Sequence, residues 1–344
     1  MAQTIIFSKK PRADVKKKPL KYRIKDTFTL FNSSDDKVVS QVMLRIVSKI
    51  IIYLLLTLGA LITVFPFYWM LATALNPAEK LQAGMPVYFG IDWNFENFIN
   101  AWNLQVIKVS GNQHINADAA IVQTAGKDLN LGMWFTNTII TVAINTILTV
   151  LTTILAAYAI AKLKFVGRSK IFGLLLITMM LPGEILTIQN LVTMNKLGWQ
   201  NSYAGIIAPF ISSVFYIFLL VQLFTSIPDS LYKAARVDGC GDWKFLWRVM
   251  VPMSTNTLAT VSVLNAIASW NSFLWPSLIV NDPTIQVLSV GLYEYTAAAS
   301  STEVYPAPNY VMAASVITIL PMFIVYLLLR KQIIAGVSRS GTKG

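Results

Sequence analysis

The sequence predicts an all-α integral membrane protein with six transmembrane helices and with both termini in the cytoplasm. Two observations lead to this fold class. The 344 residues are 55% hydrophobic with a mean hydropathy of +0.58, whereas soluble domains are roughly 45–50% apolar. Lysine and arginine are also concentrated in alternate connections between the apolar segments, as expected for loops retained on the cytoplasmic side of a membrane.

Six stretches are apolar enough for a helix of about 20 residues, which is the length that crosses about 30 Å of hydrocarbon. They lie at residues 50–75, 138–161, 171–194, 203–224, 258–280 and 310–329. The first is too long, and begins too far from the N-terminus, for a cleaved signal peptide. The chain therefore divides into a basic tail (1–49), the first span (50–75), an external loop (76–137), a helical core (138–329) with a cytoplasmic loop (225–257), and a C-terminal tail (330–344).

The charge distribution sets the predicted orientation. Of the 28 lysines and arginines, 24 fall on one side: 12 in 1–49 and four each in 162–170, 225–257 and 330–344. The other side has four, with three in 76–137, one in 182–202 and none in 281–306. Because cytoplasmic loops carry the excess of positive charge, both termini are expected inside.

The composition excludes several classes of function. One cysteine (Cys240) and one histidine (His114) leave no internal disulfide and no four-ligand zinc site, so no bound metal is expected. The net charge of +12 is divided by apolar segments rather than gathered on one surface, which argues against nucleic-acid binding. The basic tail is interpreted as a topology anchor, with binding to anionic lipid or to a partner as the alternative.

The external loop at 76–137 is too long for a simple turn and is expected to fold on the outer face. Aromatic residues are enriched where a protein meets the membrane–water interface. The loop therefore suggests an interfacial cluster made of Trp93, Phe95, Phe98 and Trp102. His114 has no second imidazole or thiol near it in sequence, so a solvated histidine is expected there rather than a metal ligand.

The cytoplasmic loop at 225–257 predicts two short helices that meet at a glycine-rich elbow. Pro228, followed by aspartate and serine, favours a helix start, and Gly239 favours the left-handed conformation that ends the helix. Asp242 is expected to cap the second helix and Pro252 to close it. Such a helix pair at a membrane surface is a candidate docking element for another protein.

At this loop the sequence resembles the permease subunits of bacterial ABC importers. Their motif is Glu-Ala-Ala, three residues, Gly, nine residues, then Ile-x-Leu-Pro. The matching positions here are Ala234, Ala235, Gly239 and Pro252, with Val249 and Val251 at the aliphatic positions. The departure is Lys233, which stands where the family has glutamate and reverses the charge.

Other segments resemble carbohydrate importers of the maltose-permease G-subunit type over roughly residues 50–344. They are FPFYWMLATALNP, AAYAIAKLKFVGRSK, MMLPGE, WNSFLWP and IIAGVSRSGTKG. The external residues 103–131 have no counterpart in that resemblance.

The resemblance implies a type I ABC importer permease in a prokaryotic plasma membrane. It implies a second permease chain, two ATPase subunits that use ATP and Mg²⁺, and an external substrate-binding protein. The chain itself would hydrolyse nothing and would bind no cofactor. In the family the motif loop is the coupling helix, a role that carries over here to Ala234, Ala235, Asp238 and Gly239.

The spans also suggest a pathway. Glu184 follows Pro182 and Gly183 at a depth of roughly 20 Å, so it either lines a transport route or bonds a neighbouring helix beside a kink. Stripes of small polar residues that include Asn145 and Asn265 either line a water-filled route or join helices. Trp270 and Asn271 could hold a sugar ring by stacking and hydrogen bonds, with core packing of Trp270 as the alternative.

Three functions other than carbohydrate import are compatible with the sequence. The first is an ABC importer for a polyol, glycerol phosphate or another solute. The second is an intramembrane enzyme, which would need paired carboxylates or a metal set, whereas Glu184 is the lone acid within the predicted spans; no catalytic residue is expected. The third is a self-sufficient channel, which would need no ATPase subunit.

Overall fold

The computed structural model describes residues 36–77, 80, 91–108, 120–121, 130–183, 185–297, 304–305 and 308–338. The chain divides into two units, Met1–Phe67 and Tyr68–Gly344, which are taken one at a time. Of the predicted features, His114, Glu184 and both chain ends lie outside the described residues.

In the first unit the described residues belong to one helix, α2 (Asp36–Ala74), of 39 residues, which crosses into the second unit at its C-terminal end. From Met43 onward its leucine, isoleucine and phenylalanine side chains are exposed all around the helix. A helix that is apolar on every face is typical of a membrane span. The predicted span at 50–75 is thus helical, and the helix starts well before it.

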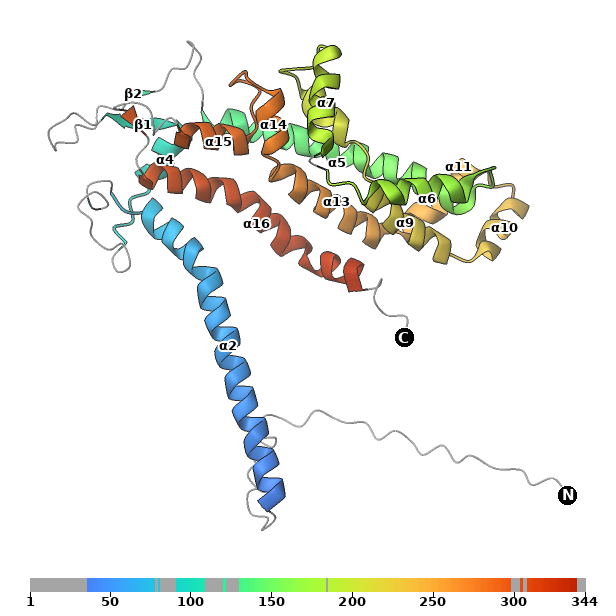
Figure 1. Ribbon diagram of the computed structural model, residues 1–344, viewed down its shortest axis with the longest axis horizontal. Helices are drawn as coiled ribbons and strands as arrows, with labels where there is room; N and C mark the ends of the chain where they lie inside the picture. The colour runs from blue at the N-terminus through green and yellow to red at the C-terminus, as the bar shows by residue number, and fades with distance from the viewer. Residues whose placement is uncertain are drawn as a thin grey trace. The chain divides into compact units, whose positions relative to one another are not determined.

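The second unit is a bundle of helices built around α5 (Leu131–Lys162), which is 32 residues long. Helix α13 (Thr255–Trp270) packs against both α5 and α16 (Pro308–Ser338), and α9 (Val214–Ser226) also packs along α5 (Figure 1). Helix α5 begins before the predicted start at residue 138. The side chain of Asn130 accepts a hydrogen bond from the Met133 backbone N–H (2.9 Å) and so caps the helix there.

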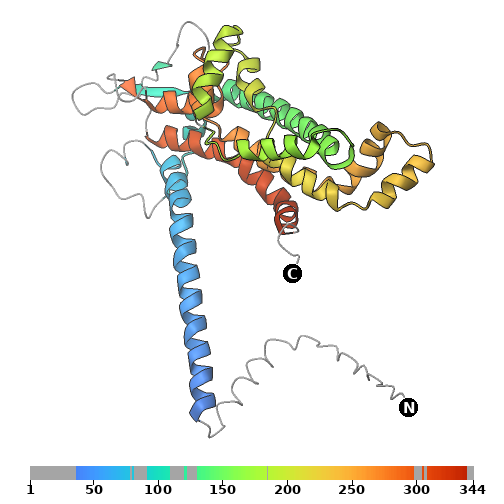
Figure 2. The same ribbon diagram turned by 45° about the vertical axis from the view of Figure 1, so that its right-hand side comes forward.

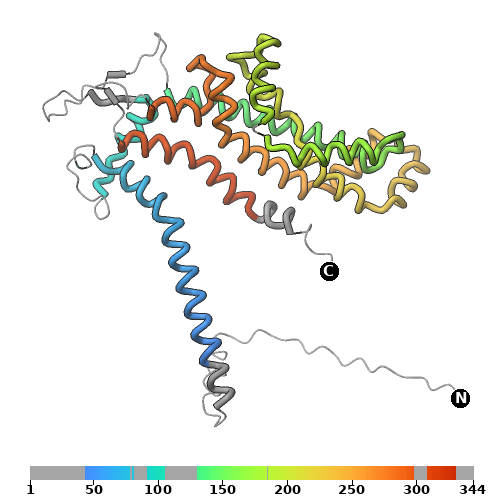
Figure 3. The backbone as a smooth tube through the Cα atoms, in the orientation of Figure 1, coloured from blue at the N-terminus to red at the C-terminus, as the bar shows by residue number. Residues whose placement is uncertain are grey.

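Three of the predicted spans are interrupted, and of these only the break at Pro182 and Gly183 was anticipated from the sequence. They are α6 (Arg168–Thr178) with α7 (Ile185–Lys196), α8 (Tyr203–Ile207) and η2 (Ala208–Phe210) with α9, and α13 with α14 (Leu274–Ile279). Pro182 and Pro209 lie at the first two breaks, and a proline removes a helical N–H and clashes with the preceding turn. Figure 3 shows the backbone turning sharply between α6 and α7.

Over the described part of the chain, three helices are long and apolar enough to cross a membrane. The pair α8–η2 and α9, bent by 45°, makes a fourth if it is one span. The count of six spans therefore stays a prediction.

A small antiparallel sheet joins two of the predicted external connections. Strand β1 (Gln105–Lys108) pairs with β2 (Ala120–Ile121) on one side and with β3 (Val304–Tyr305) on the other. Helix α4 (Glu96–Trp102) leads into β1, and α15 (Leu288–Ala297) precedes β3. Residues 105–108 and 120–121 fall in the insert that lacks a counterpart in the resemblance, so this part of the insert extends a sheet.

The predicted aromatic cluster of the external loop is divided. Trp93 and Phe95 are exposed and contact each other, with ring centroids 6.2 Å apart. Trp102 instead contacts Phe135 of α5 (6.5 Å), and Phe98 packs into the core beside α16. Trp93, Phe95 and Trp102 are exposed, whereas Phe98 and one side of the Trp102 ring hold α4 against the bundle.

The predicted cytoplasmic loop forms α10 (Asp229–Val237), α11 (Asp242–Phe245), the π-helical η3 (Leu246–Met250) and α12 (Val251–Met253). Figures 1 and 2 show α10 and α11 at the end of this unit opposite to α4. An apolar core beneath them joins α5, α9 and η3; it includes Ile154, Ala157, Leu220, Phe224, Phe245, Leu246 and Met250.

Candidate functional site

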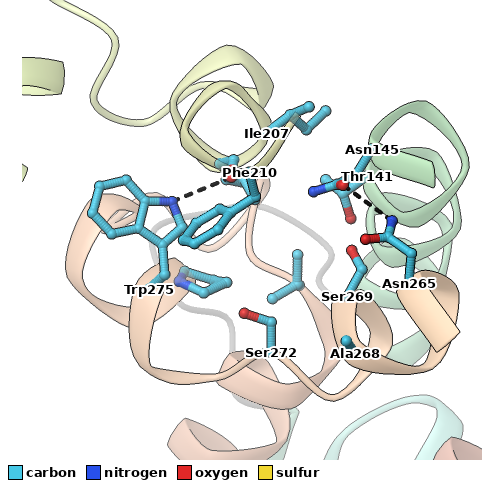
Figure 4. Close-up of a pocket in the computed structure, with 12 residues that line it drawn as sticks. Thr141, Asn145, Ile207, Phe210, Asn265, Ala268, Ser269, Ser272 and Trp275 are labelled. Carbon is cyan, nitrogen blue, oxygen red and sulfur yellow. Dashed lines mark hydrogen bonds between the residues drawn. The ribbon is translucent and has the colours of Figure 1, made fainter. Parts of the chain in front are cut away.

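A pocket of about 230 Å³ opens where two of the interrupted spans break (Figure 4). Its walls come from α5, from α8 and η2, from the C-terminal part of α13 and from α14, with one residue from the segment before α15. The lining residues are Thr141, Asn145, Ile206, Ile207, Phe210, Asn265, Ala268, Ser269, Ser272, Trp275, Pro276 and Val287.

One wall of the pocket is polar. The Asn265 side-chain amide donates to Oδ1 of Asn145 (3.3 Å) and to the hydroxyl of Thr146 (3.3 Å), which joins α13 to α5. The Thr149 hydroxyl donates to the same Asn145 oxygen (3.0 Å). Figure 4 shows Asn145 and Ser269 on this side of the cavity. These bonds fix the orientation of the Asn145 amide, because its oxygen accepts from two neighbours.

The opposite wall is aromatic. The rings of Phe210 and Trp275 meet edge to face, with centroids 5.7 Å apart. The Trp275 indole N–H donates to the backbone carbonyls of Gly205 (3.1 Å) and Ile206 (3.2 Å), which holds the buried ring against α8. Aromatic rings carry a large apolar surface with a fixed geometry, so this wall offers a flat, rigid face to the cavity.

The pocket is suited to a neutral solute with hydroxyl groups. Amide and hydroxyl side chains can donate to and accept from such groups, while an aromatic wall covers the apolar C–H faces of the same molecule. Among the described residues that line the cavity none is charged. A few convergent polar groups in an otherwise apolar lining are typical of small-molecule sites.

Threonines of α5 satisfy the backbone at the break between η2 and α9. The Thr149 hydroxyl shares its one proton between Asn145 Oδ1 (3.0 Å) and the Phe210 carbonyl (3.1 Å), and Thr152 donates to the Ile211 carbonyl (2.6 Å). Non-helical backbone at membrane depth is tolerated where protein groups replace the lost helical bonds. The polar stripe on α5 therefore both joins helices and lines the pocket, so the two interpretations of this stripe are not exclusive.

The structure brings together two of the five predicted pathway residues. Asn145 and Asn265 line the pocket and contact each other. Trp270 is buried against Phe135 (5.5 Å, edge to face), which agrees with the alternative that its ring packs in the core. Asn271 donates to the Ile267 carbonyl at the end of α13 (2.9 Å) and is not in the pocket. Glu184 lies outside the described residues.

The predicted helix pair at 225–257 is confirmed in its first half. Helix α10 follows Pro228 and ends before Gly239, whose φ of +69° is the left-handed conformation that favours glycine. Lys233, Ala234 and Asp238 are exposed, whereas Ala235 is half-buried against the core of this unit. Of the two motif alanines, Ala234 is therefore the one on the exposed face of α10.

The second half of the loop departs from the prediction in two ways. Asp242 is the first residue of α11 rather than its cap, and its carboxylate accepts hydrogen bonds from Tyr232 (2.7 Å) and Tyr158 (3.3 Å). Pro252 lies in α12, which ends one residue later at Met253 as predicted, but the π-helical η3 stands in the helix before it. The wider π-helical turn before Pro252 adjusts the backbone where a proline would otherwise break the hydrogen-bond ladder.

An ion pair fastens the start of α10 to α5. The Lys162 ammonium donates to the Asp229 carboxylate (2.8 Å) and to the Ile227 carbonyl (2.9 Å). The hydrogen bond from Lys162, and its charge, hold the pKa of Asp229 below the ordinary value. On the same helix, the hydrogen bond from Tyr232 to the Asp242 carboxylate raises the pKa of the Tyr232 phenol.

Phe210 and Trp275 were not among the predicted site residues. Trp275 belongs to the WNSFLWP segment, so the sequence contained a signal for its position but not for the direction of its ring. Phe210 follows Pro209 at the break in its span, and helix breaks are where transport sites form in many membrane proteins. No group of three metal-binding side chains occurs among the described residues.

Interrupted apolar helices, an uncharged pocket at their breaks and a surface helix pair at one end together define a membrane permease. The chain belongs to the family of binding-protein-dependent transport system inner membrane components, which it matches over residues 149–339. Its fold is the type I ABC importer permease fold that the resemblance implied.

Several known proteins are similar to this chain. The diacetylchitobiose uptake system permease protein NgcG of Streptomyces coelicolor is 29% identical over 83% of this chain and 86% of its own length. The sn-glycerol-3-phosphate transport system permease protein UgpE of Yersinia pestis bv. Antiqua is 29% identical over 83% and 94%. A solved bacterial ABC transporter for import of the acidic polysaccharide alginate has a chain with a TM-score of 0.68 and 23% identity, covering 83% of this chain and 96% of that one.

Proposed function

We propose that this chain is the permease subunit of an ATP-driven importer for a carbohydrate, in which it forms half of the translocation pathway. The observation that carries the proposal is the pocket, in which Asn145, Asn265 and Ser269 face Phe210 and Trp275. Its chemistry matches a neutral molecule with several hydroxyl groups. The similarity to a diacetylchitobiose permease supports the same substrate class.

The size of the pocket supports a shared pathway. Its volume of about 230 Å³ is below the range of about 300–1,000 Å³ typical of ligand pockets. A second permease chain facing this one would enlarge it. A partner permease, two ATPase subunits and an external substrate-binding protein are therefore the proposed assembly, and the family description itself names dependence on a binding protein.

The outer face of α10 is the proposed contact with the ATPase subunits. Lys233, Ala234, Val237 and Asp238 are exposed there, and Trp243 follows on α11 with 66% of its surface exposed. An apolar residue exposed at 88%, such as Val237, is suited to burial against another protein. ATP and Mg²⁺ would act in those subunits, and this chain would carry out no hydrolysis.

The proposed orientation puts this loop and both termini in the cytoplasm of a prokaryotic cell. Two features of the structure support it. Predicted cytoplasmic segments meet one another through Lys162 and Asp229, and predicted external segments meet through β1 and β3. The first contact joins residues 162–170 to 225–257, and the second joins 76–137 to 281–306, so each joins two connections predicted on the same side.

The substrate test uses the complete transporter with its binding protein in proteoliposomes. Radiolabelled maltose, diacetylchitobiose, glycerol and sn-glycerol 3-phosphate are each offered outside, with ATP inside. We expect ATP-dependent uptake of a neutral sugar. Asn265→Ala should reduce this uptake about tenfold, which corresponds to a loss of about 1.4 kcal/mol in binding free energy. Asn195→Ala, an exposed amide on α7, is the matched control and should transport normally.

The second candidate function is import of glycerol phosphate, which the similarity to UgpE favours. A phosphate needs cations or free backbone N–H groups around it, and the described lining supplies no cation. Uptake of sn-glycerol 3-phosphate without sugar uptake in the same vesicles would replace the carbohydrate proposal by this one. Uptake that persists without ATPase subunits would overturn both and point to a channel.

A further inference from the structure

A hydrogen-bonded carboxylate connects three elements at the end of the bundle where α10 lies. Oδ1 of Asp242, on α11, accepts from the hydroxyl of Tyr232 on α10 (2.7 Å) and from that of Tyr158 on α5 (3.3 Å). The shorter bond has the length of a charge-assisted hydrogen bond to a carboxylate. Tyr158 is 5% exposed and Asp242 is half-buried, so these bonds are partly shielded from water.

The ion pair between α5 and α10 lies close by. Lys162 is the last residue of α5, and only 4% of its side chain is exposed, although its partner Asp229 is 80% exposed. The ammonium also donates to the Ile227 carbonyl. Helix α5 therefore holds the start of α10 through Lys162 and its middle through Tyr158 and Asp242.

The backbone on either side of α10 is not helical, so side-chain contacts are needed to hold α10 in place. Helix α9 ends at Ser226, and Ile227 and Pro228 form an extended link (ψ of 124° and 135°). On the other side the chain passes through Gly239 and Gly241 before α11 begins. Helix α10 is thus attached at both ends by non-helical links, which can act as hinges.

Helix α5 extends from this point to the pocket. Asn145 lies about 20 Å from Tyr158 along the helix, at 1.5 Å per residue, and α5 contains no proline and no break. A continuous helix transmits a displacement of one end to the other as a rigid body. The same helix also holds the η2 break through Thr149 and Thr152.

We propose that Tyr158, Tyr232 and Asp242 form a polar latch that, with the Lys162–Asp229 pair, fastens α10 to α5 and so couples α10 to the pocket. The inference rests on the proposed function of this chain as a permease driven by ATPase subunits. Without the latch, the Lys162–Asp229 pair and the apolar contacts of Tyr232 and Ala235 would still hold α10, but α10 would pivot more readily on its two links when the ATPase moves it. With the latch, α5 and the pocket wall move with it, and the three residues are positioning residues for transport.

The test compares Tyr158→Phe/Tyr232→Phe with the parent in the complete reconstituted transporter. Each change removes one hydroxyl, and the Tyr232 ring keeps its edge-to-face contact with Phe245 (5.2 Å). The control is Tyr326→Phe, an exposed tyrosine on α16. Two quantities are measured: solute imported per ATP hydrolysed, and the rate at which N-ethylmaleimide modifies Cys240, the chain's single cysteine, quantified on its peptide.

We expect the double variant to hydrolyse ATP near the parental rate. Import per ATP should fall roughly fivefold, and the rate of Cys240 labelling should rise roughly fivefold. This is the change in an equilibrium that the loss of about one hydrogen bond produces. Asp242→Asn should act in the same direction, and Tyr326→Phe should change neither quantity. Parental values of both in the double variant would overturn the latch.

The design separates failure of the latch from failure of the proposed function. If the parent transporter shows no ATP-dependent import, the proposed function fails, and Cys240 labelling alone decides the latch: an unchanged rate overturns it. If the double variant is absent from the membrane, Tyr232→Phe alone replaces it, and an unchanged labelling rate and import ratio in that variant would equally refute the latch.

Discussion

At three of the described glycines, Gly132, Gly205 and Gly291, a Cβ would overlap a neighbouring group, and two of these glycines lie on α8 and α15. A Cβ on Gly205 would fall on the backbone carbonyl of Trp199, and one on Gly291 would fall on the indole of Trp134. The Gly205 contact involves backbone, which cannot rotate away. These glycines let α8 and α15 approach their neighbours closely, and they hold two elements beside the pocket in place.

We expect Gly205→Ala and Gly291→Ala each to destabilise the protein by about 1–3 kcal/mol, because overpacking displaces backbone or a buried ring. Gly173→Ala on α6, where nothing lies within 4 Å of a Cβ, is the matched control and should be neutral or slightly stabilising. Thermal unfolding in detergent, followed by size-exclusion profiles, measures the three variants. Equal midpoints for Gly205→Ala and Gly173→Ala would contradict the close approach.

Individual residues of the candidate site show how much of it could be predicted from the sequence. Asn145 and Asn265 were found because polar residues at helical spacing share a face, which is a property of one helix. Phe210 and Trp275 were missed because their positions depend on where two spans break and how the pieces then pack. Trp270 was left with two alternatives for the same reason: a tryptophan near a helix end can face the core or a cavity, and its neighbours in space decide.

At the scale of elements, the break in the span from α8 to α9 depends on α5. Thr149→Val and Thr152→Val keep the side-chain shape and remove the donors to the Phe210 and Ile211 carbonyls. Each change should destabilise the protein by about 1–3 kcal/mol, since a carbonyl is left without its partner. The unfolding midpoint measures this.

Thr193→Val is the control for these two variants. Its hydroxyl is exposed and bonds only a carbonyl of its own helix, that of Gln189 (2.8 Å). If the unfolding midpoint falls as much in this control as in Thr149→Val, the hydrogen bonds from α5 do not specifically stabilise the η2 break.

The elbow between α10 and α11 gives a second prediction at this scale. Gly239→Val should uncouple ATP hydrolysis from import, because the left-handed conformation costs a side-chain-bearing residue about 1–2 kcal/mol and the elbow would rearrange. Gly241→Ala is the matched control: its φ is −72° and a Cβ there meets nothing. Solute imported per ATP is the measurement, and normal coupling in Gly239→Val would contradict the role of the elbow.

Element boundaries illustrate why sequence reasoning succeeded in part. Long apolar runs predicted the helices of α2, α5 and α16, because the membrane demands length and apolarity that are visible in one segment. Pro182 and Gly183 indicated the break in the third span, whereas the apolar run around Pro209 concealed the break in the fourth. Pro252 predicted the end of the second helix to within one residue, but the π-helical turn before it has no signal in local rules.

At the scale of the whole molecule, the proposed orientation predicts which residues reagents reach from each side. Cys240 should react with a membrane-impermeant maleimide only after cells are opened. In a Cys240→Ser background, Glu96→Cys, an exposed position on α4, should react in intact spheroplasts. The opposite pattern at these two positions would invert the topology, and reaction at both in intact spheroplasts would contradict the separation of the two ends.

The interrupted spans have a consequence for how the chain is made. Helix α7 has 12 residues and α14 has six, fewer than the about 20 that lipid alone would accept. Neither can be released sideways into the bilayer by the insertion machinery as an independent segment. Helix α5 leaves the ribosome before the η2 break, so its threonines are in place when the Phe210 and Ile211 carbonyls arrive. Because α5 is made first, it can assist the folding of the later segment that contains the η2 break.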